Sequence, residues 1–492
     1  MANKEEKFYI TTSIVYTNAP PHIGFALESI QADVLARYNR LLGKDVFFLT
    51  GTDEHGIKVA QAAKNENKTP KGFVDEISDK VKSLKEILDL SNDDFIRTTD
   101  QKKHWPSVKK FWLKLKENGD IFKKTYQGLY CSGCEAFVTK KDLMNGKCAL
   151  HGEEPEIVEE ENYFFKLSKY KEEIKRVIER GELKILPEAR KNEILSLVEK
   201  GLEDVSFSRP RKSLEWGIPV PDDENQTIYV WADALTNYIS AIGYEKESAD
   251  FKKYWPADVH IIGKDILRFH AAIWPGMLLS LKLPLPKVIF VHGFITVAGQ
   301  KMSKSLGNVI DPFELVEKYG TEPVRYFLLR EIPAAEDGDF TYEKFEARYN
   351  ADLASGLGNL VARVLTVAEK IKPQLIKGEF QNPELTEEIN NVRKKYKKFL
   401  DEFKFNEALT SIWELISFCD KYIDKKRPWE ETENQTAIIA NLLYVIGNIA
   451  KMLQPFLPET SEKIFQQLGI KPTEEKWHFE IKKGESLFPR LN

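Results

Sequence analysis

A strand–helix–strand pattern near the N-terminus constrains the fold more than any other feature. A β-rich run at 8–14 precedes a helical pattern over 24–42 and a continuous apolar run at 46–49, which is typical of a buried parallel strand. The same order returns later as a strand, a helix and a strand at 260–262, 265–281 and 288–291. Parallel strands joined by crossover helices bind ligands at their carboxyl ends. We therefore expect an α/β fold with a split, Rossmann-like parallel sheet.

The residues between the two α/β halves follow another pattern and are predicted to form an insertion. They hold a cysteine cluster and scattered charged helices. Beyond about residue 350 the chain turns helical, and Ile439, Leu442 and Ile446, with Ile449 and Leu453, recur at helical spacing. We expect the first α/β half at 1–118, an insertion at 119–225 and the second α/β half at 226–325. A junction at 326–350 is expected to lead into an all-α helical bundle at 351–492.

Composition narrows the class of protein and its partners. Lys and Arg number 72 against 76 Asp and Glu, a net charge of −4, so any nucleic-acid contact must rest on local patches. The most apolar stretch, 437–453, is interrupted by Asn441, Asn448 and Lys451, and we expect no membrane span. The charged N-terminus does not resemble a signal peptide. Four cysteines in 492 residues suit a reducing compartment, so we expect a cytoplasmic protein.

Three of the four cysteines cluster with a histidine in a pattern typical of zinc. Cys131 and Cys134 are followed by Cys148 and His151, each pair separated by two residues. Two such pairs can close a tetrahedral Zn²⁺ site without an open position, which predicts a structural zinc knuckle. The alternative is three buried thiols beside a surface histidine. Cys419 lies in an apolar helical pattern and is expected to be a core thiol.

Two short motifs indicate phosphate chemistry. His22-Ile23-Gly24 opens the first predicted helix, whose N-terminal N–H groups suit a phosphate, although an ordinary loop histidine could also stand there. Lys301-Met302-Ser303-Lys304-Ser305 lies between Gly299 and Gly307. Its two lysines could neutralise a leaving pyrophosphate, whereas a plain surface turn would tolerate almost any polar sequence.

Together these motifs resemble those of the class I aminoacyl-tRNA synthetases. The stretches 16–24 (YTNAPPHIG), 50–56 (TGTDEHG) and 229–234 (YVWADA) narrow the resemblance to the methionyl-tRNA synthetase family, over essentially the whole chain. The resemblance implies activation of L-methionine by ATP, with release of pyrophosphate, and transfer of the methionyl group to the 3′ end of tRNA(Met). It also implies Mg²⁺ with ATP and an anticodon-binding helical domain.

The resemblance carries site residues onto this sequence. It implies ATP-phosphate contacts and catalytic roles for His22, Gly24, Lys301 and Lys304, and nucleotide contacts for Gly263, Lys264 and Asp265. It implies that Asp53 holds the α-amino group of methionine. The other expected methionine contacts come from three separated segments and include several aromatic residues: Ile14, Tyr16, Trp231, Ala234, Leu235, Tyr238, Ile266, Phe269 and His270. Each aromatic residue taken alone could simply be core packing.

One position departs from the family pattern. The first signature of the family ends in a second histidine, and Phe25 stands there. Loss of one preorganised donor typically costs on the order of 10²–10³ in rate. A catalytically impaired tRNA-binding paralogue therefore stays open as an alternative, as does a class I synthetase for another amino acid. The lysine motif argues against the first, and Tyr16, Trp231 and His270 argue against the second.

The helical region carries the implied anticodon contacts. Asn359, Arg363 and Trp429 match the residues that read the anticodon in the family, which suits unstacked RNA bases that need an aromatic platform and polar groups. Trp429 could instead be a core residue at a helix start. A basic run at 393–398 could meet RNA phosphates or form a solvated helix face. We expect the protein to act as a monomer.

Overall fold

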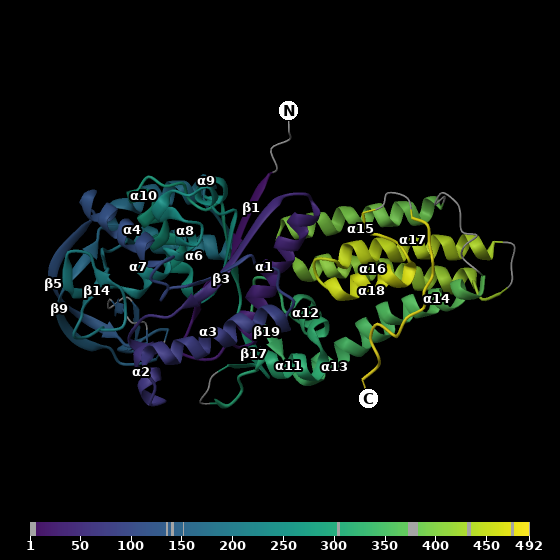
Figure 1. Ribbon diagram of the computed structural model, residues 1–492, viewed down its shortest axis with the longest axis horizontal. Helices are drawn as coiled ribbons and strands as arrows, with labels where there is room; N and C mark the ends of the chain where they lie inside the picture. Colours follow the sequence, from purple (N-terminus) through teal and green to yellow (C-terminus); the bar gives the residue numbers. More distant parts are fainter. Residues whose placement is uncertain are drawn as a thin grey trace. The chain divides into compact units, whose positions relative to one another are not determined.

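The computed structural model describes residues 6–133, 136–138, 142–150, 152–302, 306–371, 382–430, 434–473 and 477–491. The chain forms two compact units (Figure 1). The first unit comprises Met1–Pro21, Leu42–Glu86 and Leu90–His292. The second comprises His22–Leu41, Ile87–Asp89 and Gly293–Asn492.

A parallel sheet forms the centre of the first unit, as the sequence predicts. Its order is β10-β16-β15-β1-β3-β2, and β4 also pairs with β3. Every pairing in it is parallel. The strands are β1 (Lys7–Thr11), β2 (Val15–Tyr16), β3 (Asp45–Asp53), β4 (Asp94–Arg97), β10 (Lys184–Leu186), β15 (Val259–Gly263) and β16 (Val288–His292). The four predicted strands coincide with β1, β3, β15 and β16.

The strand order reverses beside β1. The chain passes from β1 to β3 on one side, whereas β15 and β16 lie on the other side. Such a reversal leaves a crevice at the carboxyl ends of the strands, where ligands of open α/β sheets bind. The segments that follow β1, β3 and β15 therefore border this crevice.

The insertion is more closely joined to the main sheet than the sequence predicts. Its centre is a long antiparallel pair, β5 (Ile121–Cys131) and β9 (Glu156–Phe165). Strand β10 lies inside the expected insertion yet pairs in parallel with β16 of the main sheet. The remaining strands of this unit are β6 (Ala136–Val138), β7 (Leu143–Met144), β8 (Lys147–Cys148), β11 (Val205–Ser206), β12 (Ser208–Pro210), β13 (Pro219–Val220) and β14 (Asp223–Ile228).

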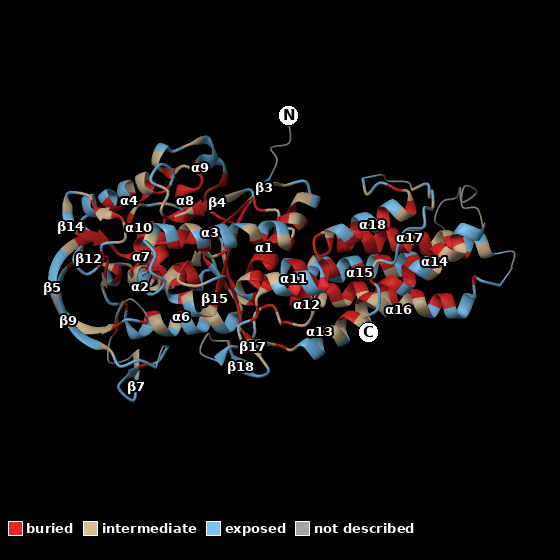
Figure 2. Cartoon of the chain, turned by 60° about the horizontal axis from the view of Figure 1, so that its bottom comes forward, coloured by how far each residue is buried: buried red, intermediate tan, exposed pale blue. Residues whose placement is uncertain are grey.

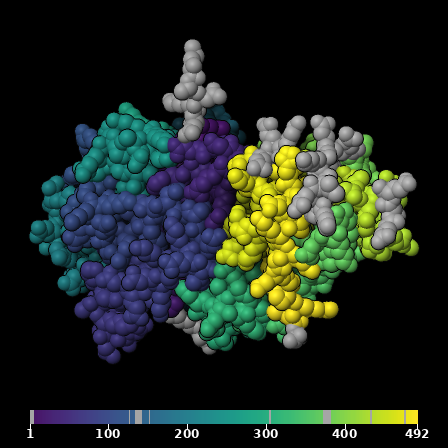
Figure 3. Space-filling model, turned by 45° about the vertical axis from the view of Figure 1, so that its right-hand side comes forward, coloured from purple at the N-terminus to yellow at the C-terminus, as the bar shows by residue number. Residues whose placement is uncertain are grey.

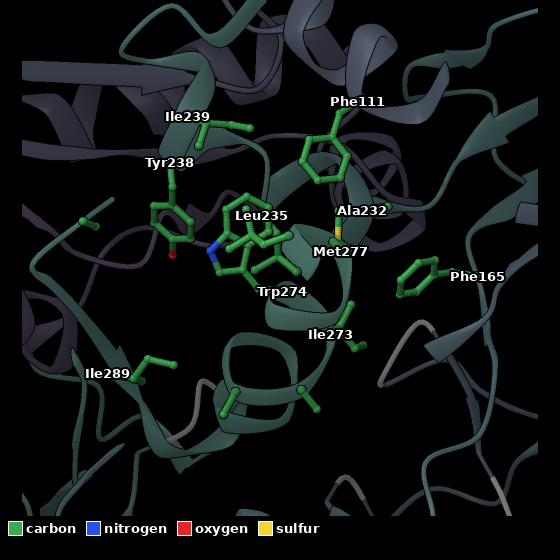
Figure 4. Packing of buried hydrophobic residues seen from close by; sticks show 14 of the residues in the cluster. Phe111, Phe165, Ala232, Leu235, Tyr238, Ile239, Ile273, Trp274, Met277 and Ile289 are labelled. Carbon is green, nitrogen blue, oxygen red and sulfur yellow. The ribbon is translucent and has the colours of Figure 1, made fainter. Parts of the chain in front are cut away.

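Helices pack against the sheet around an aromatic core. They are α2 (Ile57–Asn65), α3 (Pro70–Ile87), α4 (Trp105–Glu117), α5 (Lys171–Glu179), α6 (Glu188–Lys200), α7 (Val230–Ala234), α8 (Asn237–Ser240), α9 (Ala249–Tyr254) and α10 (Trp274–Ser280). Trp274 lies at the middle of this core (Figure 4). It stacks on Phe111, with ring centroids 5.9 Å apart, and its ring is 6.1 Å from that of Tyr238. The core thus reaches the helices that carry predicted methionine contacts.

The second unit is mainly helical. Its elements are α1 (Ile23–Leu41), β17 (Ile295–Val297), β18 (Gln300–Lys301), β19 (Gly338–Phe340), α11 (Pro312–Tyr319), α12 (Thr321–Arg330), α13 (Tyr342–Arg348), a π-helical segment (Tyr349–Gly358), α14 (Asn359–Ile371), α15 (Pro383–Asp401), α16 (Phe405–Lys426), α17 (Gln435–Leu453) and α18 (Pro458–Leu468). Helix α17 carries the predicted apolar stripe (Figure 2). The five residues of that stripe are fully buried. In length and composition α17 could cross a membrane, but 67% of its most apolar window is buried in the bundle, as in a core helix.

One buried arginine connects three separate segments of this unit. The Arg325 guanidinium of α12 donates to Asp33 Oδ2 of α1 at 2.8 Å and to the Leu88 carbonyl at 2.9 Å. It also donates to the carbonyls of Pro455 and Phe456, after α17. Both members of the Arg325–Asp33 ion pair are fully buried. This arginine therefore fixes α1 to the helical bundle.

The C-terminal segment lies along the helical unit. Figure 3 shows it as a yellow surface on the green helices. The Tyr349 hydroxyl donates to the Pro489 carbonyl at 2.8 Å, and the Leu491 N–H donates to Asn350 Oδ1 at 2.9 Å. Phe488 packs edge-on against the Tyr349 ring. The segment thus covers the start of the π-helical turn.

Candidate functional site

An aromatic pair forms one wall of a cluster at the carboxyl ends of the strands. Trp231 of α7 stacks on Phe269, which lies in the helical segment after β15, with ring centroids 3.8 Å apart and planes 9° from parallel. Both rings are partly buried against the main core. Stacked rings of this kind present one continuous apolar face to a neighbouring group.

A hydrogen-bonded tyrosine and histidine lie beside this pair. The Tyr238 hydroxyl and His270 Nε2 are 2.7 Å apart, and His270 Nδ1 is 3.0 Å from the Ile266 carbonyl. Burial lowers the pKa of His270 to about 4, so the ring is neutral near pH 7. The carbonyl accepts only from a protonated Nδ1, so Nε2 accepts from the Tyr238 hydroxyl. This fixes the orientation of both side chains.

A buried carboxylate ends the strand next to this cluster. Asp53 is the last residue of β3, lies opposite Tyr16 in the β2–β3 register, and is 5% exposed. The Thr17 N–H donates to the Asp53 carbonyl at 2.9 Å, which holds the two strand ends together. A negative group at this depth suits a ligand with an amino group.

The structure brings the predicted methionine contacts into one region. Leu235 and Tyr238 belong to the buried core cluster of the first unit, and five others are partly buried against it: Ile14, Tyr16, Trp231, Ile266 and Phe269. Ala234 is buried on α7 and His270 beside Tyr238. Their convergence at the carboxyl ends of β1, β3 and β15 is the arrangement that a ligand site in this fold requires.

The first phosphate motif lies at the start of α1, as predicted. His22 is exposed, and the Gly24 N–H donates to its Nδ1 at 3.0 Å. A Cβ on Gly24 would lie 2.8 Å from the His22 ring, closer than Cβ contacts allow, so only glycine leaves room for this imidazole. The same point is 4.0 Å from Met302 Cε. The structure therefore brings the two phosphate motifs of the second unit together.

The lysine motif itself is only partly described. Lys301 ends β18, is exposed, and has its Nζ 6.0 Å from the centre of the Phe294 ring. Lys304 lies outside the described residues. Gly299 and Gly307 have φ of 75° and 63°, which other residues rarely adopt, so glycine is needed on both sides of the motif.

The predicted nucleotide segment forms a tight turn after β15. Gly263 is the last residue of the strand, and Lys264–Ile266 form one 3₁₀ turn. A Cβ on Gly263 would lie 2.8 Å from Asp265 Oδ1. Glycine therefore leaves space for the Asp265 carboxylate above the strand end.

Two of the four predicted zinc ligands are described, and they lie together. Cys131 ends β5 and Cys148 ends β8, and both are buried in a small cluster with Val138. Cys134 and His151 lie outside the described residues. Among the residues that are described, no group of three or more potential metal ligands is found, as expected when half of the predicted set is outside them.

Two of the three predicted anticodon residues, Arg363 and Trp429, line one cavity on the helical bundle. Asn359 is exposed at the start of α14, and Arg363 follows one turn later. The Arg363 guanidinium lies 5.9 Å from the centre of the Trp429 ring and forms an ion pair of 3.2 Å with Asp424. Trp429 is 51% exposed, so it is not a core residue. Arg363, Thr366, Val367, Ile423, Pro428 and Trp429 line a cavity of about 310 Å³.

The basic run at 393–398 favours the interpretation as a solvated helix face. Lys395 pairs with Glu414 and Lys397 with Asp401, each at 2.7 Å. Arg393 donates to the Asn448 side chain. The charges of Lys395 and Lys397 are compensated within the protein, which weakens their attraction for RNA phosphates.

Comparison with known protein families decides the assignment. The family described as tRNA synthetases class I (M) matches residues 8–142 and 132–365, and the anticodon-binding domain of tRNA ligases matches residues 382–488. The chain belongs to the methionyl-tRNA synthetase family.

Curated members of the family resemble the chain along its whole length. The methionine–tRNA ligase of Caldanaerobacter subterraneus is 44% identical, across 99% of this chain and 79% of the relative. That of Clostridium acetobutylicum is 45% identical, across 100% and 79%. That of Brucella suis is 43% identical, across 94% of this chain and 92% of the relative. The alternative of a synthetase for another amino acid is thus not favoured.

Solved structures of the family share the fold. Mycobacterium tuberculosis methionyl-tRNA synthetase in complex with methionyl-adenylate superposes with a TM-score of 0.93 at 38% identity, over 99% of this chain and all of that one. The apo form of that enzyme gives a TM-score of 0.85 at 34% identity, over 100% of this chain and 99% of that one.

Sequence reasoning missed a buried polar network in the first unit. Asp233 lies between His55 and His104, with N–O distances of 2.6 and 2.7 Å. His55 and Asp233 lie inside the stretches 50–56 and 229–234, which carry the resemblance to the family. The signal was a charged residue in an otherwise apolar stretch (YVWADAL), which is expected only where a partner is present.

Proposed function

We propose that this chain activates L-methionine with ATP and transfers the methionyl group to tRNA(Met) through the residues described above. The observation that carries the proposal is the convergence of three chain segments into one aromatic cluster beside Asp53. Residues 1–118 and 226–325 would form the catalytic domain, 119–225 the zinc-bearing insertion, 326–350 the junction and 351–492 the anticodon-binding domain.

The amino-acid pocket selects an unbranched thioether with a free amino group. Methionine sulfur is polarizable and favours aromatic neighbours, which Trp231, Phe269 and Tyr238 supply. Asp53 accepts hydrogen bonds from the α-ammonium group. Ile14, Tyr16, Ala234, Leu235, Ile266 and His270 complete the pocket. An apolar pocket separates near-isosteres by only about 1–3 kcal/mol, so close homologues of methionine are also substrates.

The phosphate chemistry needs no nucleophile from the protein. The methionine carboxylate attacks the α-phosphorus of ATP, pyrophosphate leaves, and methionyl-adenylate forms. The ribose hydroxyl at the 3′ end of the tRNA then takes the methionyl group and AMP leaves. Catalysis therefore consists of alignment and of stabilisation of the phosphoryl charge. His22, Gly24, Lys301 and Lys304 contact the phosphates, and Gly263, Lys264 and Asp265 bind the nucleotide. Mg²⁺ arrives bound to the ATP phosphates and neutralises part of their charge.

The insertion would hold a structural zinc ion. Cys131, Cys134, Cys148 and His151 would be its ligands, and the shared burial of Cys131 and Cys148 supports this set. Thiolates and an imidazole are the ligands that tetrahedral Zn²⁺ prefers. Metal analysis of protein purified without added zinc tests the set. One zinc per chain is expected in the wild type and much less in Cys131→Ser, and a metal-free wild type would contradict it.

The tRNA anticodon binds on the helical bundle. The half-exposed Trp429 offers a stacking platform, and Asn359 and Arg363 offer polar groups to base edges. Four cysteines in 492 residues suit a reducing compartment, so the protein acts in the cytoplasm. The monomeric state stays a prediction that analytical ultracentrifugation would check.

The decisive experiment is ATP–pyrophosphate exchange without tRNA, run against each of the twenty amino acids. Exchange with methionine is expected and would show that Phe25 is tolerated. Exchange only with another amino acid would overturn the pocket. No exchange with any of the twenty would favour the impaired tRNA-binding paralogue, and Phe25→His would then test whether the missing donor is the reason.

A further inference from the structure

Four buried polar side chains form a continuous hydrogen-bonded chain behind the proposed methionine pocket. His55 Nδ1 is 2.6 Å from Asp233 Oδ2, and His104 Nε2 is 2.7 Å from Asp233 Oδ1. His104 Nδ1 is in turn 2.8 Å from Ser240 Oγ. All four residues are at most 2% exposed. We call these four residues the Asp233 network.

The Asp233 network joins the elements that carry the proposed methionine contacts. His55 comes two residues after Asp53, at the end of β3. Asp233 lies in α7, the helix of Trp231 and Ala234, and Ser240 ends α8, the helix of Tyr238. His104 immediately precedes α4 and bridges the other members. Loss of any one of these hydrogen bonds would therefore allow a helix or strand end that carries a proposed methionine contact to shift.

The charge of Asp233 determines how the network is oriented. Burial raises the pKa of Asp233, but the neighbouring His55 and the hydrogen bonds from both histidines lower it by more. The pKa of Asp233 therefore lies below its ordinary value. A carboxylate only accepts hydrogen bonds, so both histidine nitrogens that face it must donate. Each oxygen of Asp233 thus has its own donor, and α7 is held from two sides.

Aromatic side chains fix the outer histidine. The His55 ring lies 5.6 Å from the Trp216 ring, edge to face, and 6.1 Å from the Trp105 ring. The Trp216 indole donates to the Glu54 carbonyl at 2.6 Å, and the Gly56 N–H donates to the Trp216 carbonyl. The segment that begins with Asp53 is therefore held rigidly up to the network.

We propose that Asp233 is a positioning residue for amino-acid selection: it holds Trp231 and Asp53 at the spacing that methionine requires. Residues two apart on a helix face different sides, so Asp233 acts from behind the pocket and does not contact the substrate. The inference rests on the proposed function. It attributes no role to Asp233 in nucleotide binding, because none of its partners lies in the proposed nucleotide segment.

Asp233→Asn tests the proposal in the full chain. Asparagine has one acceptor oxygen for two N–H donors, so one histidine must change tautomer or lose its partner while the side-chain volume stays the same. In ATP–pyrophosphate exchange the KM for methionine should rise about ten-fold or more, since small displacements of a binding group are costly. The KM for ATP should stay within about two-fold of the wild type.

A matched control separates this role from simple destabilisation. Asp120 is another buried carboxylate of the first unit, held by Lys169, Tyr170 and Ser280, none of which belongs to the proposed pocket. Asp120→Asn should lower the melting temperature without changing the KM for methionine. A methionine KM in Asp233→Asn equal to that of Asp120→Asn would overturn the proposal, and so would equal increases in both KM values.

Ser240→Ala is the milder variant. It removes only the far end of the network and should raise the methionine KM about two- to three-fold, since one neutral hydrogen bond is lost. If Asp233→Asn does not fold, an unchanged methionine KM in Ser240→Ala overturns the proposal. Equilibrium dialysis with methionine alone keeps the two hypotheses apart. A wild type that binds methionine without exchange contradicts the proposed function, whereas equal binding by wild type and Asp233→Asn contradicts the positioning role.

Discussion

The proposed methionine pocket and the proposed anticodon surface present aromatic side chains in opposite ways. In the pocket, Trp231 is stacked on Phe269 and held from behind by buried hydrogen bonds. On the bundle, Trp429 is half-exposed, and the Arg363 guanidinium lies 5.9 Å from the centre of its ring. A small ligand gains affinity from walls that are fixed before it arrives, whereas an RNA base needs a free aromatic face. The same residue type therefore serves two purposes that differ in burial and support.

The comparison predicts its largest effect at Trp231. Trp231→Ala should lower kcat/KM for methionine in pyrophosphate exchange on the order of 10³-fold, or about 4 kcal/mol, because it removes one wall and the partner of Phe269. The KM for ATP should change little. A loss smaller than ten-fold would mean that the stacked pair is core packing and not a pocket wall.

Acid should weaken the buried pocket and leave the exposed surface unaffected. The pKa of His270 is about 4 when folded and about 6.5 when unfolded, so the unfolded chain binds the extra proton first. The unfolding free energy therefore falls as pH drops from about 6.5 to 4, by on the order of 3 kcal/mol for this residue. Urea unfolding at pH 7.5 and 4.5 measures the loss.

His270→Gln is the matched variant for the acid prediction, since it cannot take up the proton. Its loss of stability over the same range should be smaller than that of the wild type by about this amount. In Trp429→Ala the unfolding free energy should fall between pH 7.5 and 4.5 by the same amount as in the wild type. An equal fall of the unfolding free energy in His270→Gln and in the wild type would contradict the assignment of the acid sensitivity to His270.

At the anticodon surface the effect should be smaller and confined to tRNA. Trp429→Ala removes one stacking platform, which is worth about 1–3 kcal/mol per base, so charging of tRNA(Met) should fall about 10- to 100-fold. Pyrophosphate exchange should remain within about two-fold. A fall in both reactions together would show that Trp429 supports the fold and does not read RNA.

The smallest effect is expected on the basic face of α15. Lys395→Ala breaks an exposed ion pair with Glu414, and such pairs contribute about 0.2–1 kcal/mol. Charging should not change, and the salt dependence of tRNA binding should keep its slope. A shallower slope would identify Lys395 as a phosphate contact and contradict the solvated-face interpretation.

The sequence predicts the centre of the fold better than its insertion. The run at 46–49 in β3 is continuous and apolar, which is typical of a buried parallel strand, and the β-rich run at 8–14 contains most of β1. Strand β10 is three residues long, and its Lys184-Ile185-Leu186 has no period that separates a strand from a loop. Its place beside β16 is decided by tertiary pairing, which no local pattern encodes.

The candidate site shows the same division. The motif at His22–Gly24 and the residues around Trp231 were predicted through the resemblance to the family, because each residue taken alone could also serve plain structure. The Asp233 network was not predicted: the apolar stretch around Asp233 signals that this aspartate has a partner, but nothing in the sequence identifies His55 and His104 as the partners. Only the fold places His55 and His104 on either side of Asp233, 178 and 129 residues from it in the sequence. The roles of these residues stay predictions until the variants are measured.

Arg325 also limits how this protein can change in evolution. Its guanidinium donates to one carboxylate and to carbonyls of two further segments, all buried. Lysine would keep the charge but could not reach partners in several directions, and a neutral residue would leave the buried Asp33 with Arg37 but without Arg325. Each single replacement lowers the stability of this junction. We therefore expect substitutions at positions 33 and 325 to occur together in related proteins, because this ion pair joins α1 to the helical bundle.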